Sequence, residues 1–303
     1  MQVLGCHVSD STLASWEQRL VFEREPIFVD DARAALLPTG AVVLDSREFG
    51  ENYAMAPLDL WDSYDLYRMD RRGLSVAFLT PNEVAALPAA ARQELMSLQA
   101  SRGRGQIYDH LHGAGERDRF MVDAAPRYAL RHDTWWAMTP AARRDWLQSF
   151  VSEGRKSCLS LAVSEEQWER FGPVARRLAG RFEAVSGPNC FATALAAVTE
   201  SVALAESIAG HWLHPAPFLR GLSERGFADG GPVGGDGSAL PPGSVLLFVD
   251  DEGGLQHACY YLGDGLTLNK DGQGWFIPRQ VRPVAEVLQS WRDDGFHPRV
   301  YTQ

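Results

Sequence analysis

Three apolar runs follow one another closely near the C-terminus, and their connections are too short for anything but antiparallel pairing. The runs span Ser244–Val249, Gln256–Leu262 and Leu266–Lys270. Asp250–Gly254 and Gly263–Gly265 separate them, and such Gly- and Asp-rich connections are typical of β-hairpins. Parallel strands would need crossovers of about a dozen residues or more. The sequence therefore predicts an antiparallel sheet in this region.

A segment that strongly favours a helix precedes these strands, and it begins with a cysteine. Ser186–Asn189 has turn chemistry, and Cys190–Val198 is rich in helix-forming residues. The N-terminus of a helix carries partial positive charge and free N–H groups, which stabilise a thiolate. Cys190 is therefore a candidate nucleophile, and Asn189 beside it is a candidate substrate or oxyanion contact.

A thiol nucleophile needs a proton acceptor, and His257 at the start of the second predicted strand is the candidate. Cys259 shares its face of the strand by the period of two. Asn269 on the next strand could hold the imidazole in one tautomer, and Asp271 is the alternative orienting group. Cys259 and Asp271 are also candidate substrate contacts.

The segment Ser186–Asn269 resembles the NlpC/P60 superfamily of papain-fold cysteine peptidases and amidases. Pro242–Phe248 is similar to the family's Pro-Gly turn and first strand, and His257–Gly265 to its histidine strand with a Tyr-Leu-Gly turn. The resemblance implies a papain-like module in an α+β chain, with a catalytic triad of Cys190, His257 and Asn269 and without a cofactor. The family's usual Asp-Cys-Ser-Gly is replaced by Asn189–Ala192, and its upstream tyrosine has no counterpart here.

The resemblance implies a hydrolase that cleaves an amide or isopeptide bond through a thioacyl-enzyme. Such a cysteine peptidase, or thiol protease, or amidase would act on a peptidoglycan-type peptide or a related small amide. Two alternatives stay open: an acyltransferase on the same fold, and a catalytically silent interaction or toxin/immunity module.

Composition narrows the partners and the location. The chain has 303 residues and a formal net charge of −10, which argues against nucleic acid and anionic membranes as partners. No signal peptide or transmembrane segment is recognisable, so we expect a cytoplasmic protein. The four cysteines are scattered without a CxxC pair, so free thiols are expected rather than a zinc site. The oligomeric state is not predicted.

The N-terminal half is expected to form an α/β domain over residues 1–165, ahead of a catalytic domain over 166–303. It has strand-like runs at Ile27–Val29, Val42–Leu44 and Ser75–Leu79. Helix start signals stand at Thr80, with a helix to about Leu98, and at Thr139 and Ser164. We expect this domain to help wall the catalytic cleft with its aromatic residues Trp61, Tyr64, Tyr67, Trp135, Trp136 and Trp146.

Other motifs are better explained by structural roles than by catalysis or ligand binding. His110 and His112 form an HxH pair, but no further ligands stand nearby, so no metal site is predicted. His211 and His214 are rival bases, although histidines just past a helix are also favoured by its dipole. Gly230–Gly237 has no following Lys-Ser/Thr and is expected to be a loop within Phe227–Pro242.

Overall fold

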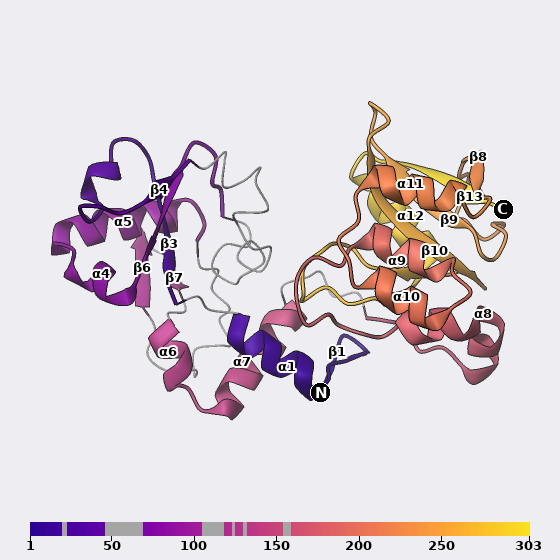
Figure 1. Ribbon diagram of the computed structural model, residues 1–303, viewed down its shortest axis with the longest axis horizontal. Helices are drawn as coiled ribbons and strands as arrows, with labels where there is room; N and C mark the ends of the chain where they lie inside the picture. Colours follow the sequence, from indigo (N-terminus) through magenta and orange to yellow (C-terminus); the bar gives the residue numbers. More distant parts are fainter. Residues whose placement is uncertain (20–22, 46–68, 105–117, 123–124, 130–131, 154–158) are drawn as a thin grey trace. The chain divides into compact units, whose positions relative to one another are not determined.

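The chain is an α+β protein whose elements form two compact units, shown by the computed structural model in Figure 1. The structure describes residues 1–19, 23–45, 69–104, 118–122, 125–129, 132–153 and 159–303. Unit 1 comprises Met1–Thr12 and Val151–Gln303, and unit 2 comprises Leu13–Phe150. In the described residues no helix has the length and apolar character to cross a membrane.

The chain's first residues, Met1–Thr12, are part of unit 1 together with the C-terminal module. The His7 N–H donates to the carbonyl oxygen of Gly180 (2.8 Å), and the Ser160 N–H donates to that of Leu4 (2.9 Å). Cys6 is fully buried there. These contacts link residues far apart in sequence, which local patterns do not reveal.

Unit 1 is built around one antiparallel sheet of six strands in the order β12-β11-β10-β9-β13-β8. The three predicted strands are its central part and pair as expected. The turn between β10 and β11 uses left-handed backbone at Gly263, Asp264 and Gly265 (φ 106°, 54° and 74°). The elements of unit 1 are β1 (Gln2–Val3), β2 (Cys6–His7), α8 (Glu165–Leu178), α9 (Cys190–Ala197), α10 (Val202–Ala209), α11 (Pro215–Ser223), β8 (Ala228–Pro232), β9 (Val245–Val249), β10 (Leu255–Gly263), β11 (Leu266–Asn269), β12 (Gln280–Pro283), α12 (Val284–Asp293) and β13 (His297–Thr302).

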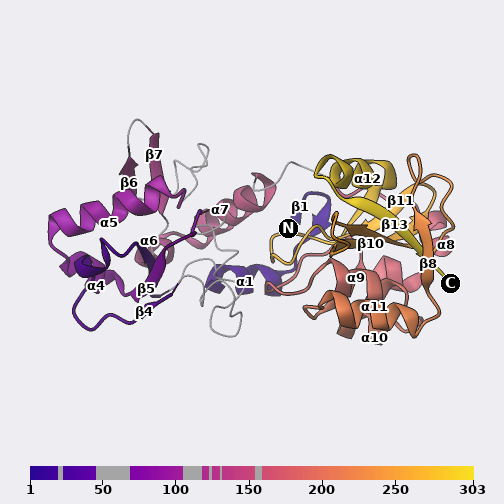
Figure 2. The ribbon, with the colours of Figure 1, turned by 90° about the horizontal axis from the view of Figure 1, so that it is seen from above.

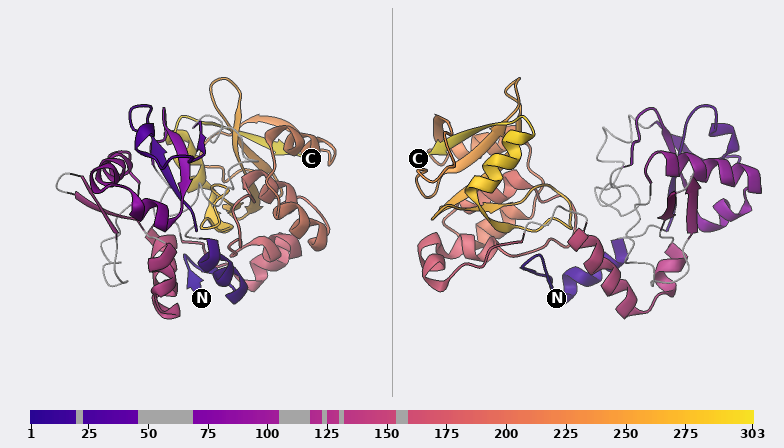
Figure 3. Two further views of the ribbon diagram at one scale, coloured as in Figure 1. Left: turned by 60° about the vertical axis from the view of Figure 1, so that its left-hand side comes forward. Right: turned by 180° about the vertical axis from the view of Figure 1, so that it is seen from behind.

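Helices cover both faces of this sheet. Figures 2 and 3 show α12 on one face and the helices α9, α10 and α11 on the other. We call these the α12 face and the α9 face. Side chains alternate between them along β9 and β10: Val245, Leu247 and Ala258 pack toward α9, and Leu246 and Cys259 pack toward α12.

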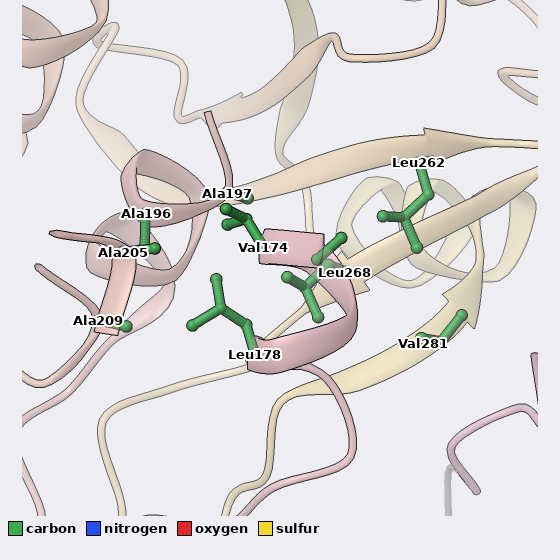
Figure 4. Close-up of a cluster of buried hydrophobic side chains, with 10 residues drawn as sticks. Val174, Leu178, Ala196, Ala197, Ala205, Ala209, Leu262, Leu268 and Val281 are labelled. Atoms are coloured by element: carbon green, nitrogen blue, oxygen red, sulfur yellow. The ribbon is translucent and has the colours of Figure 1, made fainter. Parts of the chain in front are cut away.

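The helix α8 closes the α9 face at the β11 end of the sheet. Its predicted capping box is present, with Ser164 and Gln167 bonded reciprocally. Val174 and Leu178 pack against Ala196 of α9, as Figure 4 shows together with Ala197, Ala205, Ala209, Leu262, Leu268 and Val281. This apolar contact fixes α9 against the sheet.

Two elements of unit 1 did not follow from the sequence. The strand β8 lies within the stretch expected to be a loop, and it pairs with β13 at the sheet edge. The short helix α10 follows α9 after a Ser201 cap, whose hydroxyl accepts from the Leu204 N–H (3.3 Å). Glycine-rich sequence argues against a strand, but an edge position with one partner tolerates it.

Unit 2 contains helices and small antiparallel sheets, with strand order β3-β5-β4 and a separate β6–β7 pair. Gln99 and Arg104 bond to the backbone of β3 at the sheet edge, through Phe28 and Pro26. These bonds satisfy backbone N–H and C=O groups of β3 that an open sheet edge would leave unpaired. The elements are α1 (Asp10–Arg19), which begins in unit 1, β3 (Glu25–Val29), η1 (Ala34–Leu36), β4 (Val43–Leu44), β5 (Ser75–Leu79), α4 (Pro81–Ala86), α5 (Ala89–Ser101), β6 (Asp118–Val122), β7 (Ala125–Ala129), α6 (His132–Ala137) and α7 (Pro140–Glu153), which ends in unit 1.

The helix expected to run from Thr80 to Leu98 is two helices. The capping box at Thr80 is present, but α4 ends at Ala86 and α5 begins at Ala89. Pro88 explains the break, because a proline disfavours helical backbone at the preceding residue, and Leu87 is extended (ψ 143°).

The aromatic residues expected to wall a cleft divide into two groups. Trp135 and Trp146 are buried within unit 2 in edge-to-face contact, with ring centroids 6.0 Å apart. Trp136 is exposed beneath Arg143. Several residues singled out from the sequence lie outside the described residues: Trp61, Tyr64, Tyr67, His110, His112 and Cys158.

Candidate active site

Cys190 is the first residue of α9, as the sequence predicted. Asn189 caps the helix: its side-chain oxygen accepts from the Ala192 N–H (3.1 Å). Every residue of α9 is buried, so tertiary packing fixes its position. The thiol therefore sits at a rigid helix N-terminus.

The thiol of Cys190 lies in an apolar cluster on the α9 face, beside Ala258 of β10. Only 7% of the residue is exposed. Burial raises its pKa to about 11, although the N–H groups of Ala258 and Phe191 and the charge of Lys270 act in the opposite direction. The thiol is consequently protonated at neutral pH in this structure.

His257 lies in a hydrogen-bonded chain on the α12 face. Its Nε2 lies 2.8 Å from Oδ1 of Asn269, and Nδ2 of Asn269 donates to Asp271 (2.6 Å). Arg282 of β12 donates to the other oxygen of Asp271 (3.3 Å). Asn269, rather than Asp271, contacts the imidazole directly.

This chain fixes the tautomer of His257. An amide oxygen can only accept, so Nε2 must carry the hydrogen and Nδ1 keeps its lone pair. The bond from Asn269 to Asp271 fixes the amide orientation on which this assignment depends. An Nδ1 lone pair is what a general base needs.

Two aromatic rings hold the imidazole of His257. Trp291 of α12 stacks on it at 4.3 Å between centroids and 11° between planes, and Phe248 of β9 lies at 5.4 Å. Burial lowers the pKa of His257, while the charge of Asp271 and the bond to Asn269 act against that shift. The imidazole is therefore neutral at neutral pH.

The thiol and the imidazole approach β10 from opposite faces of the sheet. Cys190 packs with Ala258, whereas the neighbouring His257 faces Trp291. Among the described residues no hydrogen bond joins the Cys190 thiol to His257. Cys190 of α9 packs beside Ala258, the residue that follows His257 on β10, while the His257 side chain lies on the other face of that strand.

The other candidate contacts have packing roles. The amide of Asn189 also exchanges hydrogen bonds with the backbone of Leu213, which ties the loop after α10 to the start of α9. Cys259 is in the apolar core of the α12 face, where burial raises its pKa. His211 bonds to the Ser207 carbonyl, as expected at a helix C-terminus. The ring of His214 lies against that of Trp212, with centroids 4.5 Å apart and the planes tilted by 47°.

Sequence reasoning missed three side chains that shape this region. Trp291 covers the imidazole, Arg282 binds Asp271, and Lys270 contributes charge near the thiol. Asp271 was expected from the sequence as the alternative orienting group, whereas no role was predicted for Lys270. The roles of Trp291 and Arg282 depend on how α12 and β12 pack, and a sequence pattern carries no signal of that.

Unit 2 contains an open hollow of about 420 Å³ between η1 and the helices α4 and α5. Its lining is mostly apolar, including Leu36, Leu37 and Leu87. The carboxylate of Glu83 at its rim already bonds to Thr80 and Arg24. The hollow thus lacks converging reactive groups of the kind found in unit 1.

Comparisons of this chain with protein-family models, with curated proteins and with solved structures find no match. The chemistry of the site therefore has to be argued from its own residues.

Proposed function

We propose that unit 1 is a papain-like cysteine hydrolase that cleaves an amide or isopeptide bond, with Cys190 as nucleophile, His257 as base and Asn269 as orienting residue. The observation that carries the proposal is the bond from Nε2 of His257 to Asn269, which leaves the Nδ1 lone pair as proton acceptor. The thiol at a helix N-terminus, beside the residue that follows His257, is the matching proton donor.

The reaction would start from a neutral pair. The thiol proton passes to Nδ1 of His257 as the sulfur bonds to the carbonyl carbon, and the carbonyl oxygen becomes an oxyanion. The oxyanion then collapses, the C–N bond breaks, and the imidazolium returns its proton to the departing amine. Water hydrolyses the thioester and releases the acid. The negative charge of Asp271 stabilises the transient imidazolium.

The substrate must reach a thiol that is almost completely buried. Acylation therefore requires that the side chains over Cys190 move. It also requires that the imidazole of His257 reach the thiol past the backbone of β10. Acyl transfer follows the same steps, with an amine or alcohol replacing water as the acceptor.

One observation favours a second candidate, the silent interaction module. Both reacting groups are buried and neutral, and no hydrogen bond joins them among the described residues. A structural cysteine would be buried in the same way.

Labelling with electrophiles separates the two candidates. The full chain is incubated near pH 7.5 with a panel of acyl-amide mimics, and the modified peptide is identified by mass spectrometry. We expect one adduct, on Cys190, that is lost in Cys190→Ala and retained in Cys6→Ala. Cys6 is a matched control because burial raises its pKa to about 11 as well. Labelling of Cys6 and Cys190 at equal, slow rates would support the silent module.

A further inference from the structure

Lys270 is a buried lysine at the end of β11, directly after Asn269. Only 1% of it is exposed. Its Nζ donates to the carbonyl oxygens of Gly274 (3.2 Å) and Ile277 (2.7 Å). Burying an ammonium is costly unless oxygen acceptors surround it, so the loop that supplies these carbonyls is folded around the charge.

The same loop holds the turn that leads into Cys190. The Gly187 N–H donates to the carbonyl oxygen of Gln273 (2.9 Å), and the Trp275 N–H donates to Oγ of Ser186 (3.2 Å). Lys270 is therefore connected to the start of α9 through two consecutive sets of hydrogen bonds.

The charge of Lys270 acts on the Cys190 thiol, and the alternation of β11 agrees with a place on the thiol's side of the sheet. Leu268 packs against α9 residues, and Asn269 turns to the α12 face to meet His257. Lys270 is the first residue after β11, where continued alternation would turn it to the α9 face. The charge of Lys270 is the one that acts favourably on the Cys190 thiolate.

Among the described residues, the tyrosines and the cysteine near the thiol offer no positive charge, and His257, next to Ala258, is neutral because burial lowers its pKa. Cys259 and Tyr260 come from β10, and Tyr301 comes from β13. Each is neutral or anionic over the pH range in which a thiol ionises.

We infer that Lys270 is a positioning residue for Cys190, which holds the Ser186–Asn189 turn through its loop and presents a fixed positive charge to the sulfur. This inference rests on the proposed function, because it takes Cys190 as the nucleophile. It assigns to one buried cation the stabilisation of the thiolate that forms when the substrate is attacked.

Alkylation rates test the charge without requiring hydrolysis. Full-length chains carrying Lys270→Met, Lys270→Gln or Lys270→Arg are treated with iodoacetamide between pH 7 and 10, and Cys190 and Cys6 are quantified in the same digest. We expect Lys270→Met and Lys270→Gln to slow Cys190 alkylation about tenfold at a fixed pH, as a rise of about one pKa unit requires. In Lys270→Arg the alkylation rate of Cys190 should stay within about twofold of the parent rate. The alkylation rate of Cys6 should be unchanged in all three variants.

Equal slowing in Lys270→Arg and Lys270→Gln would overturn the charge role. Equal slowing of alkylation at Cys6 and Cys190 would also overturn the charge role. Such a result would mean that the substitution changes how often the whole protein opens to the reagent. These outcomes leave the proposed function standing, whereas absence of any adduct from acyl-amide mimics would remove it.

A measurement on the parent chain covers the case in which the neutral variants do not fold. A positive charge beside a thiol favours an anionic reagent over a neutral one. We expect the rate ratio of iodoacetate to iodoacetamide to be several-fold higher at Cys190 than at Cys6. A ratio at Cys190 equal to or below that at Cys6 would contradict the inference.

Discussion

The two faces of the six-stranded sheet differ in how they bury the candidate reacting groups. On the α9 face, Cys190 lies among apolar side chains such as Phe218 and Val245. On the α12 face, His257 is hydrogen-bonded in a polar chain and covered by Trp291. The difference teaches that one strand, β10, can contact two candidate groups in opposite environments: the thiol of α9 packs beside Ala258, and the adjacent His257 side chain lies on the other face.

The comparison also explains why both groups are neutral. Burial raises the pKa of the Cys190 thiol to about 11 and lowers that of His257. A resting thiolate–imidazolium pair is therefore not expected, and under the proposed function the thiol would be activated as the substrate is attacked.

The largest expected effects come from removing one aromatic anchor on each face. Phe218 stacks on Phe191 on the α9 face, and Phe248 lies against the imidazole on the α12 face. We expect Phe218→Ala and Phe248→Ala each to lower the free energy of unfolding by about 3–5 kcal/mol, measured by urea denaturation. Only Phe248→Ala should also raise the pKa of His257 in NMR titrations, because it admits water to the ring. The same His257 shift in Phe218→Ala would show that the faces are not separate.

Removal of the amide that bonds to His257 should have an intermediate effect. Asn269→Leu leaves Nε2–H buried without its acceptor and takes a donor from Asp271. We expect a loss of about 1–3 kcal/mol in the free energy of unfolding. Thr267→Val is a matched control, since it removes one buried hydroxyl bond, to the Arg282 carbonyl, on the same strand. A stability loss no larger than that of the control would mean that the His257–Asn269 bond is not maintained in solution.

The smallest expected effect is a pH dependence that originates on the α12 face. Burial lowers the pKa of His257 below its ordinary value of 6.5, so the unfolded chain binds the proton first as the pH falls. The stability of unit 1 should decrease below pH 6.5 with a contribution of at most about 1.4 kcal/mol per pH unit from this residue. The His257→Gln chain should show a shallower slope between pH 6.5 and 5. Identical slopes in the two chains would contradict the assignment of a buried neutral imidazole.

Local signals predicted much of unit 1. The turn-to-helix sequence placed Cys190 at the start of α9, and hairpin connections predicted β9, β10 and β11 to within a residue. The period of two correctly put His257 and Cys259 on one face. These features depend on neighbouring residues, and a sequence shows neighbours directly.

Features that depend on distant packing could not be predicted. Nothing in the Cys190 segment shows that α9 covers the face opposite to His257, because both faces of β9 are apolar. The joining of Met1–Thr12 to unit 1 likewise depends on hydrogen bonds to residues far along the chain. A fragment that begins near Ser164 would lack these contacts and therefore part of unit 1.

The central claim is that the thiol and the imidazole act as one unit although they reach β10 from opposite faces. The most direct test is a double-mutant cycle on the acylation rate with an activated p-nitrophenyl ester, using the parent, Cys190→Ala, His257→Gln and the double variant. We expect each single variant to lose about 100-fold or more and the double variant to lose no more than Cys190→Ala, because groups that act together are not additive. Acylation of the His257→Gln chain at the parental rate, with its fold intact by circular dichroism, would contradict the account.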